Sequence, residues 1–465
     1  MAGFKYVVGA VLLGAVGAAM AGEDFKPSID LGIIHTDNLT LVPSDPEAAT
    51  VWKLTPAFTF DHESARFKTN AAYRMEAYHY NERGENAVFN QFDGKVAVGL
   101  VPDRFFLNFA ANRNQAIVDP LSTLATSTLA FTTNRVDLDS YSVGPSFQTS
   151  AGGDSVVRGE FERTRVKYGD TVVPVALDNY DYDTTSVSAD NYKKGSGLTW
   201  AAHFNGQKAD YTNEFYEHRE AGLELGFWSG QATRIFAVAG RESPWDTPLE
   251  RGLKDPFWEV GFVRDVTSHL HAELGFGDRS FGASRHGKLD VTFAHGTSSL
   301  SYSQLPRTNS FDRFNRGALV DPADPDYLFR ADAIERYIAN RWQWNLLLKF
   351  TRMDVTLIAY NELRDHRTRV DGTPLSNETQ NGARLTVTWK MGPRMDLIFS
   401  GGTADNHFDE GAGTDLGLGS IGLLRRLGSR TAVRVQYDDA RVEYTPVSTF
   451  GYRNHMLTAS VARQF

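Results

Sequence analysis

The sequence predicts an all-β fold, an antiparallel up-and-down barrel, and three observations support this prediction. Apolar and polar residues alternate in many short runs along the 465 residues, and no long helical stripe interrupts them. Short turns and long polar loops alternate between these runs. The last run, Met456 to Phe465, has one apolar face and one face of small polar residues. Strands of this kind have two faces that meet different media.

The first 21 residues predict a cleaved signal peptide. Lys5 supplies positive charge, Val7 to Val16 is an apolar run containing Gly and Ala, and Ala19-Met20-Ala21 forms a cleavage site that leaves Gly22 as the first mature residue. We expect residues 22–465 to form a single barrel without a plug domain. No other run reaches the roughly 18 apolar residues of a membrane helix. Export, together with the absence of cysteine, fits a bacterial outer-membrane protein.

Strands are expected from the start of the mature chain. The first two cover Phe25 to His35 and Val51 to Asp61, on either side of a polar loop. In the next strand Tyr73 and Met75 alternate with Arg74 and Glu76, which places apolar and charged side chains on opposite faces. The same unit continues to the carboxyl end and gives about 22 strands, within a range of roughly 16 to 22.

The connections predict the orientation of the barrel. Glycine-containing turns such as Gly152-Gly153 and Gly428-Ser429 alternate with long polar loops. The longest loops are Arg113 to Arg135, Ser243 to Asp255 and Leu305 to Ala331. This asymmetry is typical of transmembrane barrels of the outer membrane, whose short turns are periplasmic. A soluble sandwich, propeller or β-helix also has many short strands, but it does not require alternating short and long connections.

The carboxyl-terminal strand predicts an assembly signal. Leu457, Val461 and Phe465 share its apolar face. A terminal aromatic residue on such a strand resembles the signal that the barrel-assembly machinery recognises in its clients. Arg463 departs from this pattern, because it places a charge on the same lipid-side face.

Three stretches in the first third of the chain resemble the PEP-CTERM system-associated outer-membrane proteins. They are Ile29 to Asn38, which contains Thr36-Asp37-Asn38, then Ser64 to Lys68, and Val101 to Phe106. The resemblance implies an exosortase and exopolysaccharide context, with exopolysaccharide or exported surface proteins passing the barrel and periplasmic export proteins as partners. The family has no established catalytic residues, so the resemblance implies none here.

Charged residues at inward positions are the candidates for the lumen wall. Both signs are mixed along it, and a single-sign ladder of the kind that selects ions is not evident. Such a wall suits a wide path for a hydrated polymer or an interior filled by loops, and simple mutual neutralisation explains the charges equally well. The candidates are Arg66, Lys68, Arg74, Glu76, Lys95, Arg158, Glu160, Glu162, Glu224, Glu273, Lys288, Arg384, Lys390 and Arg434.

The sequence does not predict an enzyme. His295 lies near Ser298, but no carboxylate that could orient the histidine is evident. His269 and His271 are two residues apart on an expected strand face, and a third metal ligand is not evident. We therefore expect no catalytic residues and no cofactor.

Asp321, Asp324 and Asp326 are the best candidates for an ion site. Acidic loops rich in oxygen ligands suit Ca²⁺. Asp-Pro turns explain the same spacing better, so no metal is expected. The net charge of −9 is spread over many mixed charges and does not indicate a nucleic-acid partner.

These features predict a passive outer-membrane channel or secretion barrel in contact with outer-membrane lipid. The alternative is a structural or assembly barrel that binds periplasmic partners and conducts nothing. A barrel of about 22 strands has a wide lumen, so the two longest loops are expected to close it. In the first of these loops, Leu121, Leu124, Leu129 and Phe131 can pack inside the lumen.

Overall fold

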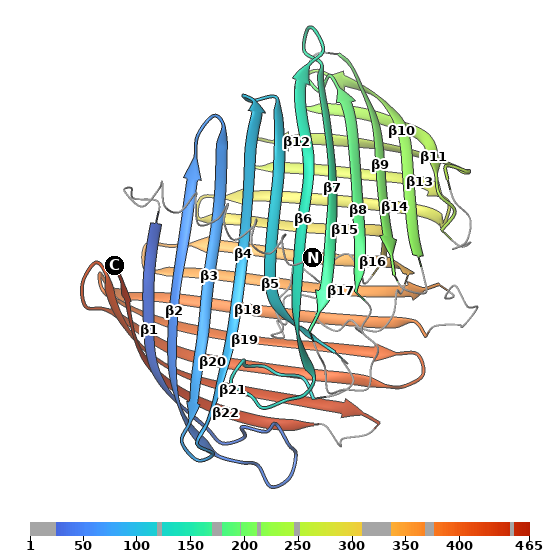
Figure 1. The fold of residues 1–465 in the computed structure, drawn as a ribbon. Coiled ribbons are helices and arrows are strands. Elements are labelled where there is room, and N and C mark those ends of the chain that lie inside the picture. The colour runs from blue at the N-terminus through green and yellow to red at the C-terminus, as the bar shows by residue number, and fades with distance from the viewer. Residues whose placement is uncertain are drawn as a thin grey trace.

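A single closed sheet makes up the wall of the molecule. The computed structural model describes residues 25–118, 123–169, 179–195, 197–211, 215–245, 252–308, 336–367, 376–446 and 451–465. In this part of the chain, 22 antiparallel strands follow one another around the wall, and β1 pairs with β22 to close it. Strands of the near wall cross those of the far wall in Figure 1, as expected from the strand tilt that closure requires.

The strands are β1 (Phe25–Thr36), β2 (Ala49–Glu63), β3 (Phe67–Tyr80), β4 (Glu85–Val101), β5 (Phe105–Ile117), β6 (Arg135–Ser150), β7 (Val156–Tyr168), β8 (Tyr180–Asp190), β9 (Leu198–Asp210), β10 (Phe215–Ser229), β11 (Thr233–Glu242), β12 (Asp255–Thr267), β13 (Leu270–Arg279), β14 (Gly282–Phe293), β15 (Gly296–Thr308), β16 (Arg336–Lys349), β17 (Met353–His366), β18 (Glu378–Gly392), β19 (Met395–Phe408), β20 (Gly413–Arg426), β21 (Thr431–Thr445) and β22 (Tyr452–Gln464). This order confirms the prediction of an all-β antiparallel barrel with 22 strands for the described residues. A helix long and apolar enough to cross a membrane is not found among them.

The two ends of the barrel differ. Connections from odd- to even-numbered strands, such as residues 37–48, leave one end, which we call the loop side. Connections in the other sense, such as residues 64–66 and 393–394, leave the opposite end, which we call the turn side. The start of β1 and the end of β22 also lie at the turn side, where the Phe465 amide donates to the Pro27 carbonyl oxygen over 3.0 Å.

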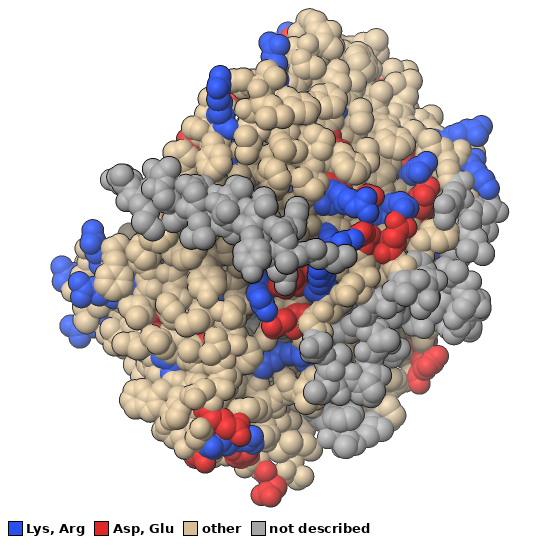
Figure 2. Space-filling model, in the orientation of Figure 1, with Lys and Arg blue, Asp and Glu red and all other residues tan. Residues whose placement is uncertain are grey.

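An apolar belt covers the outer face of the wall. In β10, Leu223, Leu225 and Phe227 are 51%, 52% and 55% exposed, while the residues between them face inward. Exposed Trp342 and Trp389 lie on the same outer face of their strands. Figure 2 shows broad surfaces without charge, and Lys, Arg, Asp and Glu gather between them and at their margins. A belt of this kind is stable in contact with lipid rather than water.

The wall continues past the apolar belt on the loop side. A tilted strand needs roughly 9–11 residues to cross a bilayer, whereas β4 has 17 residues and β2 has 15. At several loop-side ends the outward positions are charged. For example, Arg163 and Arg165 of β7 contact Asp181 of β8 at 3.1 and 2.6 Å. The outer surface therefore carries charged pairs at parts of its loop-side rim, beyond the apolar belt.

One glycine allows a close approach within the wall. The ladder between β6 and β7 is interrupted at Gly144 and Pro145. Proline has no amide hydrogen to donate, so it is compatible with such an interruption. A Cβ atom at Gly144 would lie 1.7 Å from the Phe161 carbonyl oxygen, so β6 and β7 can approach here only because position 144 has no side chain.

Candidate functional site

The inner face of the wall carries the charged residues predicted for the lumen, with one exception. Strand register places the other candidates on the face opposite the apolar belt. Arg66 instead lies in the β2–β3 turn, where the Ser64 hydroxyl accepts from the Phe67 amide and ends the alternation. The inward residues are Lys68, Arg74, Glu76, Lys95, Arg158, Glu160, Glu162, Glu224, Glu273, Lys288, Arg384, Lys390 and Arg434.

Many of these charges are paired within the wall. Glu76 contacts Lys53 at 3.0 Å and Arg74 at 2.6 Å. Further pairs are Lys68–Glu63, Arg158–Asp190, Glu224–Arg234, Glu273–His286, Lys288–Asp290 and Lys390–Asp354. The sequence did not identify Lys53, Arg234 and His286 as partners of these charges, because a partner on a neighbouring strand is identified only by the register. Pairing of opposite signs leaves a polar wall with little net preference for one charge.

A cavity of about 760 Å³ opens on the inner wall of β1–β5 and β20–β22. Its polar lining includes Lys26, Arg74, Gln91, Asn112 and Gln464. These side chains supply both hydrogen-bond donors and acceptors, so this part of the lumen suits water and hydrated solutes.

A segment between β5 and β6 lies across the loop-side opening of the barrel. We call residues 123–134 the mouth segment. Leu124 and Leu129 are 0% and 1% exposed. Leu124 packs with Leu416 and Val442 of β20 and β21, which are far from β5 around the wall. Because this contact can form only across the interior, the mouth segment occupies the lumen.

Apolar side chains also hold the far end of the mouth segment. Leu129 packs in a cluster with Ile34, Val51 and Tyr80 from the first three strands. The Phe131 ring lies 4.6 Å from the Tyr80 ring, measured between centroids. Burial of the two leucines contributes about 1.5–3 kcal/mol for each side chain relative to exposure, and the partly buried Phe131 ring contributes less.

Hydrogen bonds fix the mouth segment to the wall at both ends. At one end, the Tyr452 hydroxyl donates to the Leu124 carbonyl oxygen at 2.6 Å, and the Leu124 amide donates to the Tyr444 hydroxyl at 3.2 Å. At the other end, the Tyr80 hydroxyl donates to the Leu129 carbonyl oxygen at 3.0 Å. These bonds satisfy backbone groups that would otherwise be buried without partners.

The centre of the mouth segment contacts the buried charge cluster on β3. The Thr128 hydroxyl donates to the Glu76 carboxylate at 2.6 Å, and the Tyr78 hydroxyl lies 2.8 Å from Thr128 Oγ1. Lys53 and Arg74 bind the other oxygen of Glu76. The predicted lumen residue Glu76 therefore joins the wall to the segment that narrows the mouth.

The predicted loop boundaries need correction. Residues Arg113 to Ile117, expected in the first long loop, belong to β5, and Leu305 to Thr308, expected in the second, belong to β15. The physical reason is that both strands continue beyond the apolar belt, where consecutive polar residues such as Asn114 and Gln115, or Arg307 and Thr308, interrupt the alternation. Leu121 and the candidate ion ligands Asp321, Asp324 and Asp326 lie outside the described residues.

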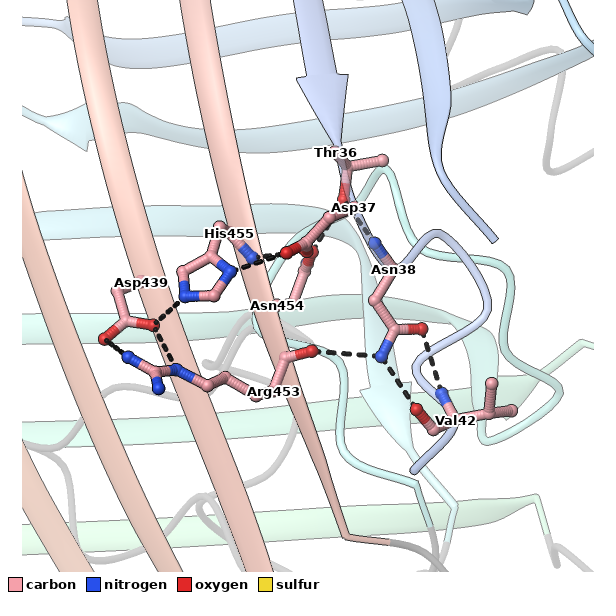
Figure 3. Close-up of polar contacts among 8 residues, drawn as sticks. All are labelled: Thr36, Asp37, Asn38, Val42, Asp439, Arg453, Asn454 and His455. Atoms are coloured by element: carbon pink, nitrogen blue, oxygen red, sulfur yellow. Dashed lines mark hydrogen bonds and ion pairs between the residues drawn. The ribbon is translucent and has the colours of Figure 1, made fainter. Parts of the chain in front are cut away.

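Thr36, Asp37 and Asn38 join β1 to β22 at the loop side (Figure 3). The Thr36 hydroxyl donates to Asn454 Oδ1 over 2.6 Å, and Asp37 accepts from the His455 amide at 2.8 Å. Asn38 Nδ2 donates to the carbonyl oxygen of Arg453 at 3.0 Å. Thr36, Asp37 and Asn38 thus close the wall at its seam.

A chain of charged groups extends from this seam along the outer face. His455 Nδ1 lies 2.5 Å from Asp37, and His455 Nε2 lies 3.2 Å from Asp439, which also contacts Arg453 at 3.2 Å (Figure 3). Partial burial of Asp37 raises its pKa, but the hydrogen bonds from His455 outweigh this effect and hold the pKa below its usual value. Asp37 is therefore ionised at neutral pH.

The residues of the expected assembly signal lie on the outer face. Leu457, Val461 and Phe465 are 51%, 46% and 59% exposed. The guanidinium group of Arg463 lies over the Phe465 ring, 5.4 Å from its centroid. This contact places the charge at the turn-side edge of the apolar belt.

His295 and His269, which were considered for catalysis and metal binding, have other surroundings in the structure. The ring of His295 lies 5.4 Å from the Phe350 ring in a tilted arrangement, and Ser298 Oγ accepts from Trp344 Nε1 at 2.9 Å. His269 precedes β13 and lies in a turn, so the expectation that it shares a strand face with His271 is wrong. Among the described residues, one group of three potential metal ligands is found, and it involves neither histidine.

Comparisons with known proteins identify the fold. No family model matches the sequence, and no curated protein matches it. The siderophore receptor PirA from Acinetobacter baumannii aligns with a TM-score of 0.52 and 9% identity, over 96% of this chain and 81% of that chain. PirA from Pseudomonas aeruginosa gives 0.47, with 9% identity over 96% and 80% of the two chains. The outer membrane protein OpdK from the same organism gives 0.37, with 8% identity over 95% and 100%. The fold is that of outer-membrane barrels, and identities this low show the fold alone.

Proposed function

We propose that this chain is a passive, non-enzymatic outer-membrane channel whose mouth is narrowed by the mouth segment. The observation that carries the proposal is the course of residues 123–134 across the interior, fastened to Glu76, Tyr80 and Tyr452. The mixed polar wall and the cavity beneath the segment favour a hydrated solute. Transporters of this strand number have plugged lumens, and here a loop takes that position.

The solute proposed is a hydrophilic polymer, either an exopolysaccharide or an exported surface protein. The proposal rests on the resemblance of three amino-terminal stretches to the PEP-CTERM system-associated proteins. The lumen chemistry is compatible with it, because paired charges and amides offer hydrogen bonds without retaining a polymer of one sign. Export through the barrel then requires displacement of the mouth segment.

The test is ion conductance through the purified barrel in planar lipid bilayers. Wild type is expected to show small or infrequent openings. Replacing residues 123–131 by a short Gly-Ser linker is expected to produce large, long-lived openings and to sensitise cells to bulky antibiotics. As a matched control, Glu160→Gln removes one lumen carboxylate on β7 and keeps the segment intact. Equal conductance in the deletion and wild type contradicts the proposal.

A second function is supported by the extent of the burial in the mouth. Leu124 and Leu129 are completely enclosed, which suits a permanently filled barrel that binds periplasmic partners. Such a docking barrel conducts nothing, with or without the segment. A closed barrel after the deletion, together with co-purifying periplasmic proteins, favours this second function over the channel.

A further inference from the structure

A cluster of potential metal ligands lies on the inner wall near the loop side, away from the mouth segment's contacts. His218 and Glu220 belong to β10 and Glu242 to β11. One ligand atom from each of these side chains lies within 4.8 Å of the others. Strand register places all three on the inner face, opposite Leu223 and Leu225 of the apolar belt.

A single cationic nitrogen now bridges the two carboxylates. Arg279 Nη1 lies 2.8 Å from Glu220 Oε2 and 3.0 Å from Glu242 Oε2. The remaining oxygens are also held, since Glu220 Oε1 lies 2.9 Å from His203 Nε2 and Glu242 Oε1 accepts from the Ser280 amide at 2.6 Å. Two carboxylates fixed in this way around one positive atom form the geometry of a bridging cation site.

His218 supplies a second, independent observation. Its Nδ1 atom is buried and has no hydrogen-bond partner, and one nitrogen of its ring lies within 4.8 Å of a carboxylate oxygen from each glutamate. Its ring meets the Trp245 ring edge-on at 5.5 Å, which holds the imidazole plane. A buried polar atom without a partner is costly. A neutral imidazole nitrogen is also the commonest metal ligand in proteins, so a bound metal would remove this cost.

We propose that His218, Glu220 and Glu242 bind a divalent transition metal of the Zn²⁺ class, which takes the place of Arg279 Nη1. Ligands at about 2.1 Å from a tetrahedral Zn²⁺ are roughly 3.4 Å apart, so each side chain needs to move by only about 1 Å. His203 keeps Glu220 oriented as an outer-shell partner. One imidazole and two carboxylates favour a borderline metal over Ca²⁺, which prefers oxygen ligands alone.

Arg279 has a position to which it can withdraw. Its guanidinium group already lies over the Phe257 ring, 4.6 Å from the centroid, and Phe257 is buried beneath it. A small rotation keeps this cation–π contact and frees the two carboxylates. The arginine and the metal therefore compete for the same pair of negative charges.

Titration calorimetry of the detergent-solubilised full barrel with Zn²⁺ tests the proposal. We expect one Zn²⁺ per chain, and no comparable heat from Ca²⁺. His218→Ala and the shape-preserving Glu220→Gln are each expected to weaken binding at least about tenfold. Arg279→Met is expected to tighten it by a similar factor, because the competing cation is removed. Each variant is first checked for the heat-modifiable migration of a folded barrel.

His271→Ala is the matched control, because it removes a lumen histidine that contacts Asp265 instead of this cluster. Its Zn²⁺ affinity is expected to equal that of wild type. The proposal is overturned if wild type binds no Zn²⁺, if His218→Ala binds as tightly as wild type, or if Arg279→Met gives no increase. Equal binding of Ca²⁺ also overturns it, since the cluster would then act as acidic groups alone.

Discussion

Replacement of Thr128 by valine is the most direct way to loosen the mouth segment. The Thr128 hydroxyl donates to Glu76 at 2.6 Å and accepts from Tyr78 at 2.8 Å, in a buried environment. Valine keeps the shape of threonine and removes both bonds. A hydrogen bond to a charged group contributes about 1.5–3 kcal/mol. The equilibrium between the docked and released segment is therefore expected to shift toward release by roughly 10- to 150-fold.

Single-channel recording measures this shift as the fraction of time spent in large openings. Thr128→Val is expected to raise that fraction by roughly 10- to 150-fold without changing the conductance of the open state. Serine at position 128 restores the hydroxyl and is the matched control, so Thr128→Ser is expected to behave like wild type. A Thr128→Val barrel that opens no more often than Thr128→Ser would refute the role of the Thr128–Glu76 contact.

Three further outcomes are expected. Gly144→Ala is expected to lower the free energy of unfolding by about 1–3 kcal/mol in urea titrations, because β6 and β7 must separate, whereas Gly417→Ala, with open space around its Cβ, is the control. Phe465→Ala is expected to lower the amount of heat-modifiable barrel in membranes if the terminal aromatic residue is an assembly signal, and an unchanged amount argues against that role. A cysteine replacing Glu410 at the loop side is expected to react with an impermeant maleimide on intact cells, and one replacing Gln231 at the turn side is not; the opposite pattern inverts the orientation.

The wall could be predicted from the sequence because its physical requirement is local. Each strand has one face toward lipid and the other toward a polar interior, so apolar and polar residues such as Tyr73 and Arg74 must alternate along it. This alternation no longer predicts strands beyond the apolar belt, where the outer face of the wall is not in contact with lipid. Residues Arg113 to Ile117 continue β5 above the apolar belt, and the three polar residues that begin this run occupy both faces, so the sequence resembles a loop. Arg66 has the inward parity, but the Ser64 turn removes it from the wall.

The contacts inside the barrel could be predicted only in part. The apolar residues Leu124 and Leu129 in a polar loop indicated a segment that packs in the lumen, and they are buried there. The partners of Leu124, Tyr444 and Tyr452, are more than 300 positions away in the chain, so pattern and spacing give no sign of them. The cluster around Glu242 could not be predicted either, because β10, β11 and β13 bring its residues together only once the strand register is known.

The seam between β1 and β22 limits how a barrel of this kind can change in size. The start of β1 and the end of β22 both lie at the turn side, and the two strands pair antiparallel. Gain or loss of one strand would bring the two seam strands parallel and leave the first and last residues at opposite rims. Gain or loss of a whole hairpin keeps the antiparallel closure intact. Duplications or deletions in the gene that keep this antiparallel closure, with both chain ends on the turn side, therefore widen or narrow the pore in steps of two strands.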